Sequence, residues 1–578
     1  MSRRRDGFAA RWLALAAVLL PLSACSTVPT SSATVQITQA ESRPVEEVGI
    51  EPLPPEPGAT PEEIVRGFID AAASVRAGHP VAKEHLAPAA AKKWTDEGDI
   101  TVLSPDYATV TTVSGTVSVT ANLVGTVDKR GVFTVGGNRR FTREFTLEKV
   151  HGEWRITDPP DGLIILQPDF ERIYDHLSVY FLDPTEQRLV PDPRFVIIGT
   201  AQPTTLVQRI LDGPSGPLAA GVRNPLAGVE LRSAVAVDGQ DMVVDLTGLT
   251  TDPAPLLSEI CAQLVWTLSQ SELRVRVQIR VDGEPVAIDG VPDEQTVDDW
   301  QSFNPDAVPL DAVGHYVSRG ALHTVTTGAP VPGPAGTSAY GLTSAAVSAD
   351  PRTRELSFLA GVRQTPGSAT LFVGPYKGPL SPAVTGRTLS APTVAGTRAE
   401  AWVVRDGTAV IRVPSGGKPQ AVNAPTLAGL GQADVLRLSP DAVRAALVVD
   451  GPGGRTLYIG TVTRAENGAV ELRDLRGIAP SLSQVVDVAW RDSRTLLVLA
   501  GNAAADRIVP YSVGVDGWNV TAVPTAGLPG QAEAIGAAPT MQPLVETRGT
   551  IWQLAGGTWV TLVRGAEPLP GTAPFYPL

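Results

Sequence analysis

Cysteine is nearly absent from this chain, with only two among 578 residues, Cys25 and Cys261. Two thiols cannot provide the framework of several disulfides that holds small secreted domains together. Cys261 lies on the apolar stripe of a helical pattern over residues 256–268, which is typical of a buried, unreactive thiol. We therefore expect folding to depend on hydrophobic cores, and we do not expect Cys261 to be a nucleophile.

Motifs for metal, phosphate or nucleophilic chemistry are also lacking. The six histidines are scattered and form no His-Glu-x-x-His motif, and the sequence contains no Cys-x-x-Cys, Walker loop or Gly-x-Ser-x-Gly. The sequence therefore predicts no catalytic residue, no metal site and no cofactor. We expect a protein that is not an enzyme.

An excess of positive charge and long apolar runs are missing as well. The net charge is -13 with no basic patch, which argues against a nucleic-acid partner. After residue 25 no apolar run reaches the roughly 20 residues that a membrane-spanning helix needs. The contents of 43% hydrophobic and 19% charged residues are usual for folded protein, and the length leaves room for about three or four domains.

The N-terminal residues have the pattern of a lipoprotein export signal. An arginine-rich start precedes the short apolar stretch Trp12–Leu22, and small residues then precede Cys25. This is the lipobox of bacterial lipoproteins, in which the thiol carries diacylglycerol and the amino group a further acyl chain. We predict a signal peptide over residues 1–24, Cys25 as the lipidated residue, and a position on the extracytoplasmic face of the cell membrane.

Residues 25–59 combine Ser, Thr, Pro and Glu and carry few apolar side chains after Cys25. Such a segment buries too little surface to fold by itself. We expect an acidic, proline-rich linker between the lipid and the first domain.

A first domain is predicted over residues 60–166. Thr60 and Glu63, with a proline between them, form a capping box that starts a helix. A second helical stretch is expected near Lys83 to Trp94. Four strands are expected over Thr109–Val113, Thr116–Val127, Phe141–Val150 and Trp154–Ile156. This order of helices and strands resembles the NTF2-like (cystatin-like) α+β class.

A second domain is predicted over residues 172–295. We expect strands at Val179–Leu182, Arg188–Pro191, Arg194–Ile197 and Val243–Leu246, a helix from Thr204 to Asp212, and a half-buried strand in which Val275, Val277, Ile279 and Val281 alternate with polar residues. The Val-Tyr-Phe opening, Leu211-Asp212-Gly213-Pro214, Asn224-Pro225 and Val281-Asp282-Gly283-Glu284-Pro285 resemble the GerMN module of sporulation and germination proteins. The exposed row Arg274, Arg276 and Arg280 is either a binding site for an anionic wall polymer or an ordinary solvated sheet face.

The remaining residues, 310–578, contain a repeat. An apolar strand, a glycine turn and a second strand recur six times, with the turn glycines 41 to 50 residues apart, from Gly320 to Gly549. This period indicates an all-β propeller, preferably of six blades, with five or seven blades or a pair of sandwiches as alternatives. The first repeat lacks its leading strand, and we expect the final segment Ala573–Tyr576 to supply it and close the ring.

Aspartates recur at turns of these repeats, at Asp350, Asp441 and Asp492. Their equivalent positions favour a role in turn geometry over catalysis. Two carboxylates meeting in a propeller channel would still permit a glycoside hydrolase, which stays open as the least favoured alternative.

The whole series of lipobox, acidic linker, α+β domain, GerMN-like module and propeller resembles the actinobacterial lipoprotein family LpqB along nearly the entire chain. That resemblance implies an accessory protein of an MtrA–MtrB type two-component system. Its expected partner is the extracytoplasmic domain of the sensor histidine kinase, with an influence on cell-wall homeostasis and division. Only Cys25, the lipid acceptor, is carried over as a family residue. A lipoprotein that binds peptidoglycan or another wall glycan is the alternative.

Overall fold

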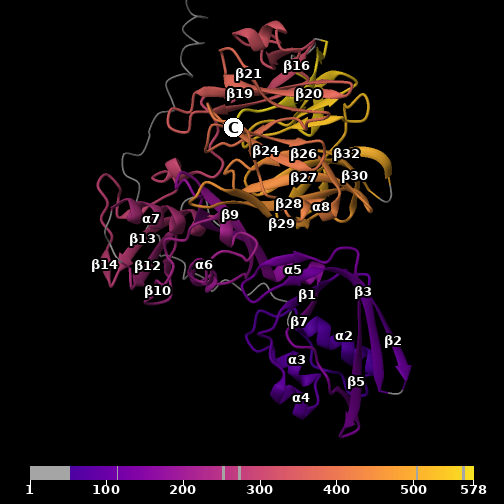
Figure 1. Cartoon of the computed structure of the whole chain (residues 1–578). Helices are drawn as coiled ribbons and strands as arrows, with labels where there is room; N and C mark the ends of the chain where they lie inside the picture. Colours follow the sequence, from indigo (N-terminus) through magenta and orange to yellow (C-terminus); the bar gives the residue numbers. More distant parts are fainter. Residues whose placement is uncertain (1–51, 114, 250–253, 271–274, 503–504, 563–566) are drawn as a thin grey trace, which may run out of the picture. The chain divides into compact units, whose positions relative to one another are not determined.

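The computed structural model describes residues 52–113, 115–249, 254–270, 275–502, 505–562 and 567–578 (Figure 1). The predicted signal peptide and Cys25 lie outside the described residues, as does most of the predicted linker. The described chain consists mainly of strands with few helices. In chain order it forms an α+β domain, a second α+β domain and a propeller.

The N-terminal domain begins with helix α2 (Pro61–Ala71), and the predicted capping box is confirmed. The Glu63 amide donates to Thr60 Oγ1 at 3.3 Å, and the Thr60 amide donates to Glu63 Oε2 at 2.8 Å. These two bonds satisfy amides that the first helical turn leaves without partners. The helix buries Ile64, Val65, Phe68, Ile69 and Ala71 against the domain core.

The second predicted helix is wrong in extent. The chain forms α3 (Pro80–Glu84) and then α4 (Pro88–Lys93). Pro88 interrupts the helix because a proline has no amide hydrogen and disfavours helical backbone in the preceding residue. Ala87 is accordingly extended, with ψ of 148°.

The helices of this domain accompany a seven-stranded sheet in the order β6-β5-β3-β1-β7, with β2 and β4 also paired to β3. The strands are β1 (Ile100–Leu103), β2 (Ala108–Val113), β3 (Thr116–Val127), β4 (Phe133–Val135), β5 (Arg140–Val150), β6 (Glu153–Ile156) and β7 (Leu163–Leu166). The four predicted strands are present, whereas β1, β4 and β7 were not predicted. The pair β1 and β7 is parallel, and α2 contacts β2, β3, β6 and β7.

Helix α5 (Gln167–Ile173) leads into the hairpin of β8 (Tyr174–Leu182) and β9 (Leu189–Ile197). The prediction of a separate third segment at Arg194–Ile197 is wrong, because that segment continues β9. Pro191 and Pro193 are compatible with one strand because they alternate along it, opposite Tyr180 and Ser178. The positions that lack an amide hydrogen therefore face the edge away from β8, where no ladder is interrupted.

The rest of the second domain is a six-stranded sheet covered by helices. Strands β12 and β13 are parallel, and helix α7 forms the crossover between them. The elements are α6 (Gln202–Leu211), β10 (Glu230–Leu231), β11 (Ala236–Asp238), β12 (Asp241–Thr247), α7 (Ala254–Leu268), β13 (Arg276–Val281), β14 (Glu284–Pro285) and β15 (Glu294–Gln295). The helix predicted over Thr204–Asp212 and the alternating strand are thus confirmed.

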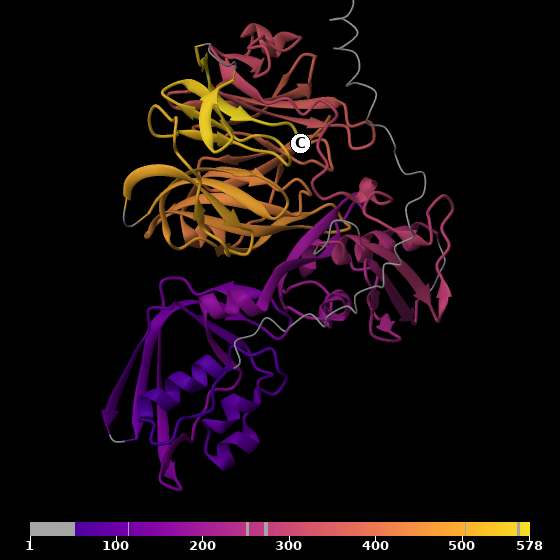
Figure 2. The ribbon, with the colours of Figure 1, turned by 180° about the vertical axis from the view of Figure 1, so that it is seen from behind.

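The C-terminal residues form a propeller of six sheets, coloured from salmon red through orange to yellow (Figure 2). Its innermost strands, β39, β18, β22, β26, β30 and β34, contact one another in that order, and β34 returns to β39. The six-blade prediction is confirmed, and the five-blade, seven-blade and sandwich alternatives are wrong. A closed ring leaves neither end blade with an uncovered apolar face.

The blades have the following strands. The first blade contains β39 (Thr572–Phe575), β16 (His315–Ser318) and β17 (Ala321–Thr324); the second contains β18 (Ser344–Ala349), β19 (Leu356–Thr365), β20 (Ser368–Pro375) and β21 (Ser381–Gly386). The third contains β22 (Thr393–Val394), β23 (Glu400–Arg405), β24 (Ala409–Pro414) and β25 (Gln420–Ala421); the fourth contains β26 (Gln432–Leu438), β27 (Arg444–Gly451), β28 (Gly454–Arg464) and β29 (Val470–Gly477). The fifth contains β30 (Leu482–Trp490), β31 (Thr495–Asn502), β32 (Ala505–Gly514) and β33 (Thr521–Ala522); the sixth contains β34 (Ala534–Gly536), β35 (Leu544–Thr547), β36 (Thr550–Ala555), β37 (Thr558–Thr561) and β38 (Leu569–Pro570). Helix α8 (Leu427–Leu430) precedes β26.

The predicted closure by the final segment is confirmed. Strand β39 pairs antiparallel with β16, with His315 opposite Phe575 and Val317 opposite Thr572. The last strand along the chain is therefore the innermost strand of the first blade, and the ring is held by hydrogen bonds between its two ends.

The three domains meet at a cluster of aromatic side chains. Trp518, from the fifth blade, is buried in the core of the N-terminal domain. Its ring centroid lies 4.9 Å from that of Phe133, 5.7 Å from that of Phe170 and 4.9 Å from that of Phe195 on β9. Edge-to-face contacts at these distances stabilise the contact between domains beyond the burial of apolar surface.

Candidate functional site

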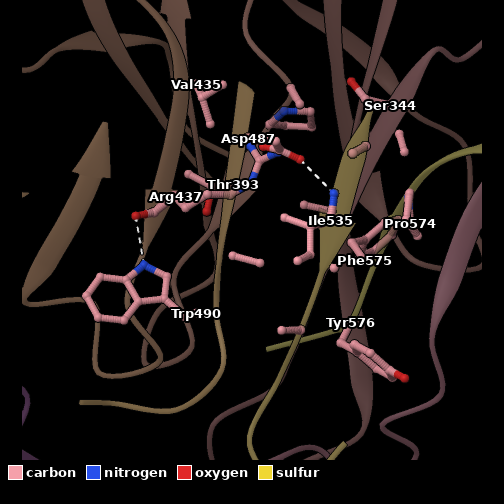
Figure 3. A pocket seen from close by; sticks show the side chains of 18 of the residues that line it. Ser344, Thr393, Val435, Arg437, Asp487, Trp490, Ile535, Pro574, Phe575 and Tyr576 are labelled. Atoms are coloured by element: carbon pink, nitrogen blue, oxygen red, sulfur yellow. Dashed lines mark hydrogen bonds and ion pairs between the residues drawn. The ribbon is translucent and has the colours of Figure 1, made fainter. Parts of the chain in front are cut away.

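A cavity of about 240 Å³ lies among the innermost strands of the propeller (Figure 3). Its wall combines many alanines with a few larger side chains, among them Arg437 and Asp487 from adjacent blades. Small residues on the inner strands leave this space because their side chains do not reach the axis of the ring. The central channel is a common place for ligands in propellers and is our first candidate site.

Two charged groups of this wall, Arg437 and Asp487, are paired with each other, and the exposed Glu533 also lines it. Arg437 Nη2 donates to Asp487 Oδ1 at 3.1 Å, and the Ile535 amide donates to Asp487 Oδ2 at 3.0 Å, a bond drawn in Figure 3. Burial raises the pKa of the Asp487 carboxyl, and the charge of Arg437 opposes that shift without cancelling it. Both carboxylate oxygens thus accept hydrogen bonds from the protein, as in a structural ion pair.

Aromatic residues and the C-terminal segment complete the cavity. Trp490 Nε1 donates to the Arg437 carbonyl at 3.0 Å, and the Tyr576 hydroxyl donates to the Gln542 carbonyl at 2.7 Å. Burial raises the pKa of Tyr576 to about 12, so its hydroxyl stays protonated. The site can hold a small, largely apolar group, and its buried hydrogen bonds fix its shape.

The recurring turn aspartates bind backbone amides, as the sequence indicated. Asp350 Oδ1 accepts the Arg352 and Thr353 amides at 2.9 and 3.0 Å. Asp441 Oδ1 accepts the Val443 amide at 2.9 Å, and Asp492 Oδ1 accepts the Arg494 amide at 2.8 Å. These bonds hold the tight turns between strands.

The arginine row of the second domain is engaged within its own sheet. Arg276 Nε and Nη2 donate to the two carboxylate oxygens of Asp241 at 2.6 and 2.8 Å, and Glu294 lies 3.3 Å from Nε. Arg280 donates to the side chain of Gln278 at 2.8 Å, whereas Arg274 lies outside the described residues. The contacts favour a solvated sheet face over a polymer-binding row.

Cys261 is buried on α7, as predicted, and is a free thiol. Burial raises its pKa to about 12. Because the thiolate is the reactive form, this residue is unreactive at neutral pH.

Sequence reasoning missed the polar contacts between the second domain and the propeller. Arg188 Nη1 donates to the Pro440 carbonyl at 3.0 Å, and Arg444 donates to the Pro191 carbonyl. Within β9, Arg194 pairs with Asp192 at 2.7 Å, and both side chains are buried. The partners of the first two bonds lie far apart in sequence, so no spacing reveals them. The sequence signal for such contacts is an arginine that lies within or directly beside an apolar strand, as Arg188 and Arg444 do.

The described residues also lack two other features of known kinds of site. They contain no cluster of three or more histidine, cysteine, aspartate or glutamate side chains with the geometry of a metal site. Within the same part of the chain, no helix has the length and apolar character needed to cross a membrane.

Three family models match consecutive parts of the chain. The model described as "Lipoprotein LpqB, N-terminal domain" matches residues 54–171, and that described as "Sporulation and spore germination" matches residues 178–287. The model described as "Lipoprotein LpqB beta-propeller domain" matches residues 320–577. Their order agrees with the fold order predicted from the sequence.

Curated relatives match nearly the full length. A protein of Rhodococcus opacus (strain B4) named Lipoprotein LpqB is 32% identical over 563 residues, covering 93% of this chain and 92% of the relative. Lipoprotein LpqB of Mycobacterium tuberculosis (strain CDC 1551 / Oshkosh) is 31% identical over 592 residues, covering 96% and 97%. Among solved structures, the nidogen/laminin complex covers 46% of this chain and 98% of its own, at 8% identity and a TM-score of 0.35. That similarity is too low to inform function.

Proposed function

Because this chain belongs to the LpqB family of lipoproteins, we propose that it is anchored through Cys25 on the extracytoplasmic face of the membrane and serves as an accessory protein of a sensor histidine kinase. The observation that carries the proposal is the full-length match to proteins named as lipoproteins, together with the lipobox that ends at Cys25. The kinase would be of the MtrA–MtrB type, and the output would be cell-wall homeostasis and division.

The physical properties of the described domains support a binding role. Two carboxylates, Asp487 and Glu533, line the propeller channel, but Asp487 is bound to Arg437 and the Ile535 amide and the channel is small. A glycoside hydrolase, which needs a pair of catalytic carboxyl groups, therefore has little support there. A protein of this kind acts through its surfaces. Lipidation would confine those surfaces to the layer occupied by the extracytoplasmic part of a kinase, and confinement raises the effective concentration of each partner.

The experiment is crosslinking in intact cells. A photoreactive amino acid replaces one exposed apolar residue in each domain: Val110, Val237 or Val560, whose exposed fractions are 56%, 48% and 38%. These side chains contribute little to the cores, so each variant should fold. We expect the kinase to be captured from at least one position and to be lost when Cys25→Ala is added.

The same experiment can contradict the proposal. If all three positions capture wall material and none captures a kinase, the accessory role is wrong and the wall-binding alternative is right. The three positions also report which domain lies next to the partner.

A further inference from the structure

A second and larger cavity, of about 550 Å³, lies between the second domain and the propeller. The turn of the β8–β9 hairpin contributes Arg188, and the segment before the propeller contributes Phe303 and Val308. The β18–β19 turn of the second blade contributes Arg352 and Arg354. Its volume is within the range of pockets that hold small ligands, about 300–1,000 Å³.

The cavity carries an excess of positive charge. Its two acidic residues are already bound, since Glu186 pairs with Arg223 and Asp350 accepts two backbone amides. The three arginines, by contrast, have no carboxylate within ion-pair distance among the described residues. Arg188 donates to the Pro440 carbonyl and Arg354 to the Val308 carbonyl, so these two guanidinium groups bind neutral oxygens and no carboxylate directly.

Arg188 is largely removed from water, which makes its positive charge costly. Burial lowers the pKa of this guanidinium, the carboxylates of Asp441, Asp183 and Asp306 act in the opposite direction, and the charge of Arg354 adds to the lowering. A desolvated cation without a direct counter-ion gains more from binding an anion than an exposed cation does. Arg352 is exposed, and its guanidinium makes no hydrogen bond with another described residue, so it is free to turn toward a ligand.

We infer that this cavity binds a small ligand carrying a carboxylate or phosphate group, with Arg188 and Arg352 as the anion-binding residues. Guanidinium groups match the geometry of both oxyanions through paired N–H donors. Phe303, Val308 and Pro309 provide an apolar wall for the uncharged part of the ligand. Because the cavity is formed by two domains and the segment that joins them, a ligand held there stabilises their contact.

The test uses the full chain purified in detergent and titrated with inorganic phosphate, succinate and the uncharged analogue succinamide, followed by calorimetry. We expect phosphate or succinate to bind and succinamide not to bind, and the comparison of the two anions separates the phosphate source from the carboxylate source. Arg352→Gln should weaken binding at least tenfold. Its side chain makes no structural bond, so this variant should fold.

Two further variants make the result decisive. Arg188→Gln should also weaken anion binding, and Arg352→Lys should retain part of it because the charge remains. Arg140→Gln, an exposed arginine on β5 in the N-terminal domain, removes the same charge elsewhere and should bind like the original chain. The inference is overturned if neither anion binds, or if binding is the same in Arg352→Gln, Arg188→Gln and Arg140→Gln.

Discussion

His176 Nε2 lies 2.8 Å from Asp516 Oδ2, so an imidazole on β8 of the second domain meets a carboxylate of the fifth propeller blade. Two residues away, Trp518 enters the core of the N-terminal domain. The same turn of the propeller therefore makes a polar contact with one domain and an apolar contact with another. A few side chains of this turn therefore join the propeller to both other domains.

The His176–Asp516 pair predicts a pH-dependent stability. Burial raises the pKa of Asp516, but the hydrogen bond and charge of His176 outweigh burial, and the net shift is downward. A carboxyl whose pKa is lowered in the folded state stabilises the protein at pH values above its ordinary pKa of 3.8. That contribution is lost as the pH falls through the pKa of the folded state. We expect Asp516→Asn to lose about 1–2 kcal/mol at pH 7 and less at pH 3, which lies below the ordinary carboxyl pKa of 3.8. Urea denaturation followed by tryptophan fluorescence measures both values.

A control for this experiment is Asp289→Asn, which changes an exposed aspartate of the second domain. It should match the original chain at both pH values. A loss in Asp516→Asn that is the same at pH 7 and pH 3 would contradict the assignment.

The ion pair in the propeller channel predicts the opposite pH dependence. Arg437→Met leaves the buried Asp487 without its cation, which costs about 3 kcal/mol or more at pH 7. Since burial holds the Asp487 pKa above its unfolded value, the native state takes up a proton more readily than the unfolded state, and stability is regained as the pH falls. Thermal unfolding at pH 7 and pH 5 should show that recovery. The double variant Arg437→Met/Asp487→Asn should show no such recovery, and an equal loss at both pH values in the single variant refutes the idea.

Ring closure depends on a close approach between β34 and the C-terminal segment. A methyl group added at Gly536 would lie 2.5 Å from the Pro574 carbonyl oxygen, which forces the two strands apart. Gly536→Ala should therefore destabilise the propeller by about 1–3 kcal/mol. Gly453→Ala, which meets nothing within 4 Å, should change stability by less than about 0.5 kcal/mol. Calorimetric unfolding of both variants measures the difference. Equal melting temperatures would show that ring closure does not require a glycine at position 536.

Membrane attachment should depend on one of the two thiols. Cys25→Ala is expected to move the protein from the membrane pellet to the soluble fraction, because the acyl chains supply the attachment. Cys261→Ala, in the buried core of α7, should remain in the pellet. Fractionation after a high-salt wash distinguishes the two. Retention of Cys25→Ala in the pellet would show that another element holds the protein there.

Much of the fold follows from local patterns along the chain. Turn glycines at intervals near 45 residues led to the six blades, and the missing strand before His315 led to closure by the last residues. The capping box at Thr60 marked the first helix at its true start. The predictions drawn from these features are correct because caps, turns and strand alternation depend on residues close in sequence.

The errors have equally local causes. Pro88 divides the second predicted helix, and the two segments predicted at Arg188–Pro191 and Arg194–Ile197, on either side of Pro193, form one strand. A proline stops a helix because it removes a required amide, but on the free edge of a strand it removes nothing. Only the position of the strand in the sheet decides between these outcomes.

The amino-acid order alone predicted the sequence of modules, Cys25 as the lipid acceptor and the closure of the propeller, because each prediction depends on short motifs or a regular period. The tertiary structure decided that Trp518 lies in another domain's core, that Arg276 is paired with Asp241, and that Arg188 and Arg352 share one cavity. Those relationships join residues that are far apart in sequence. Such contacts form, and stabilise the protein, only when the folded chain brings the residues together.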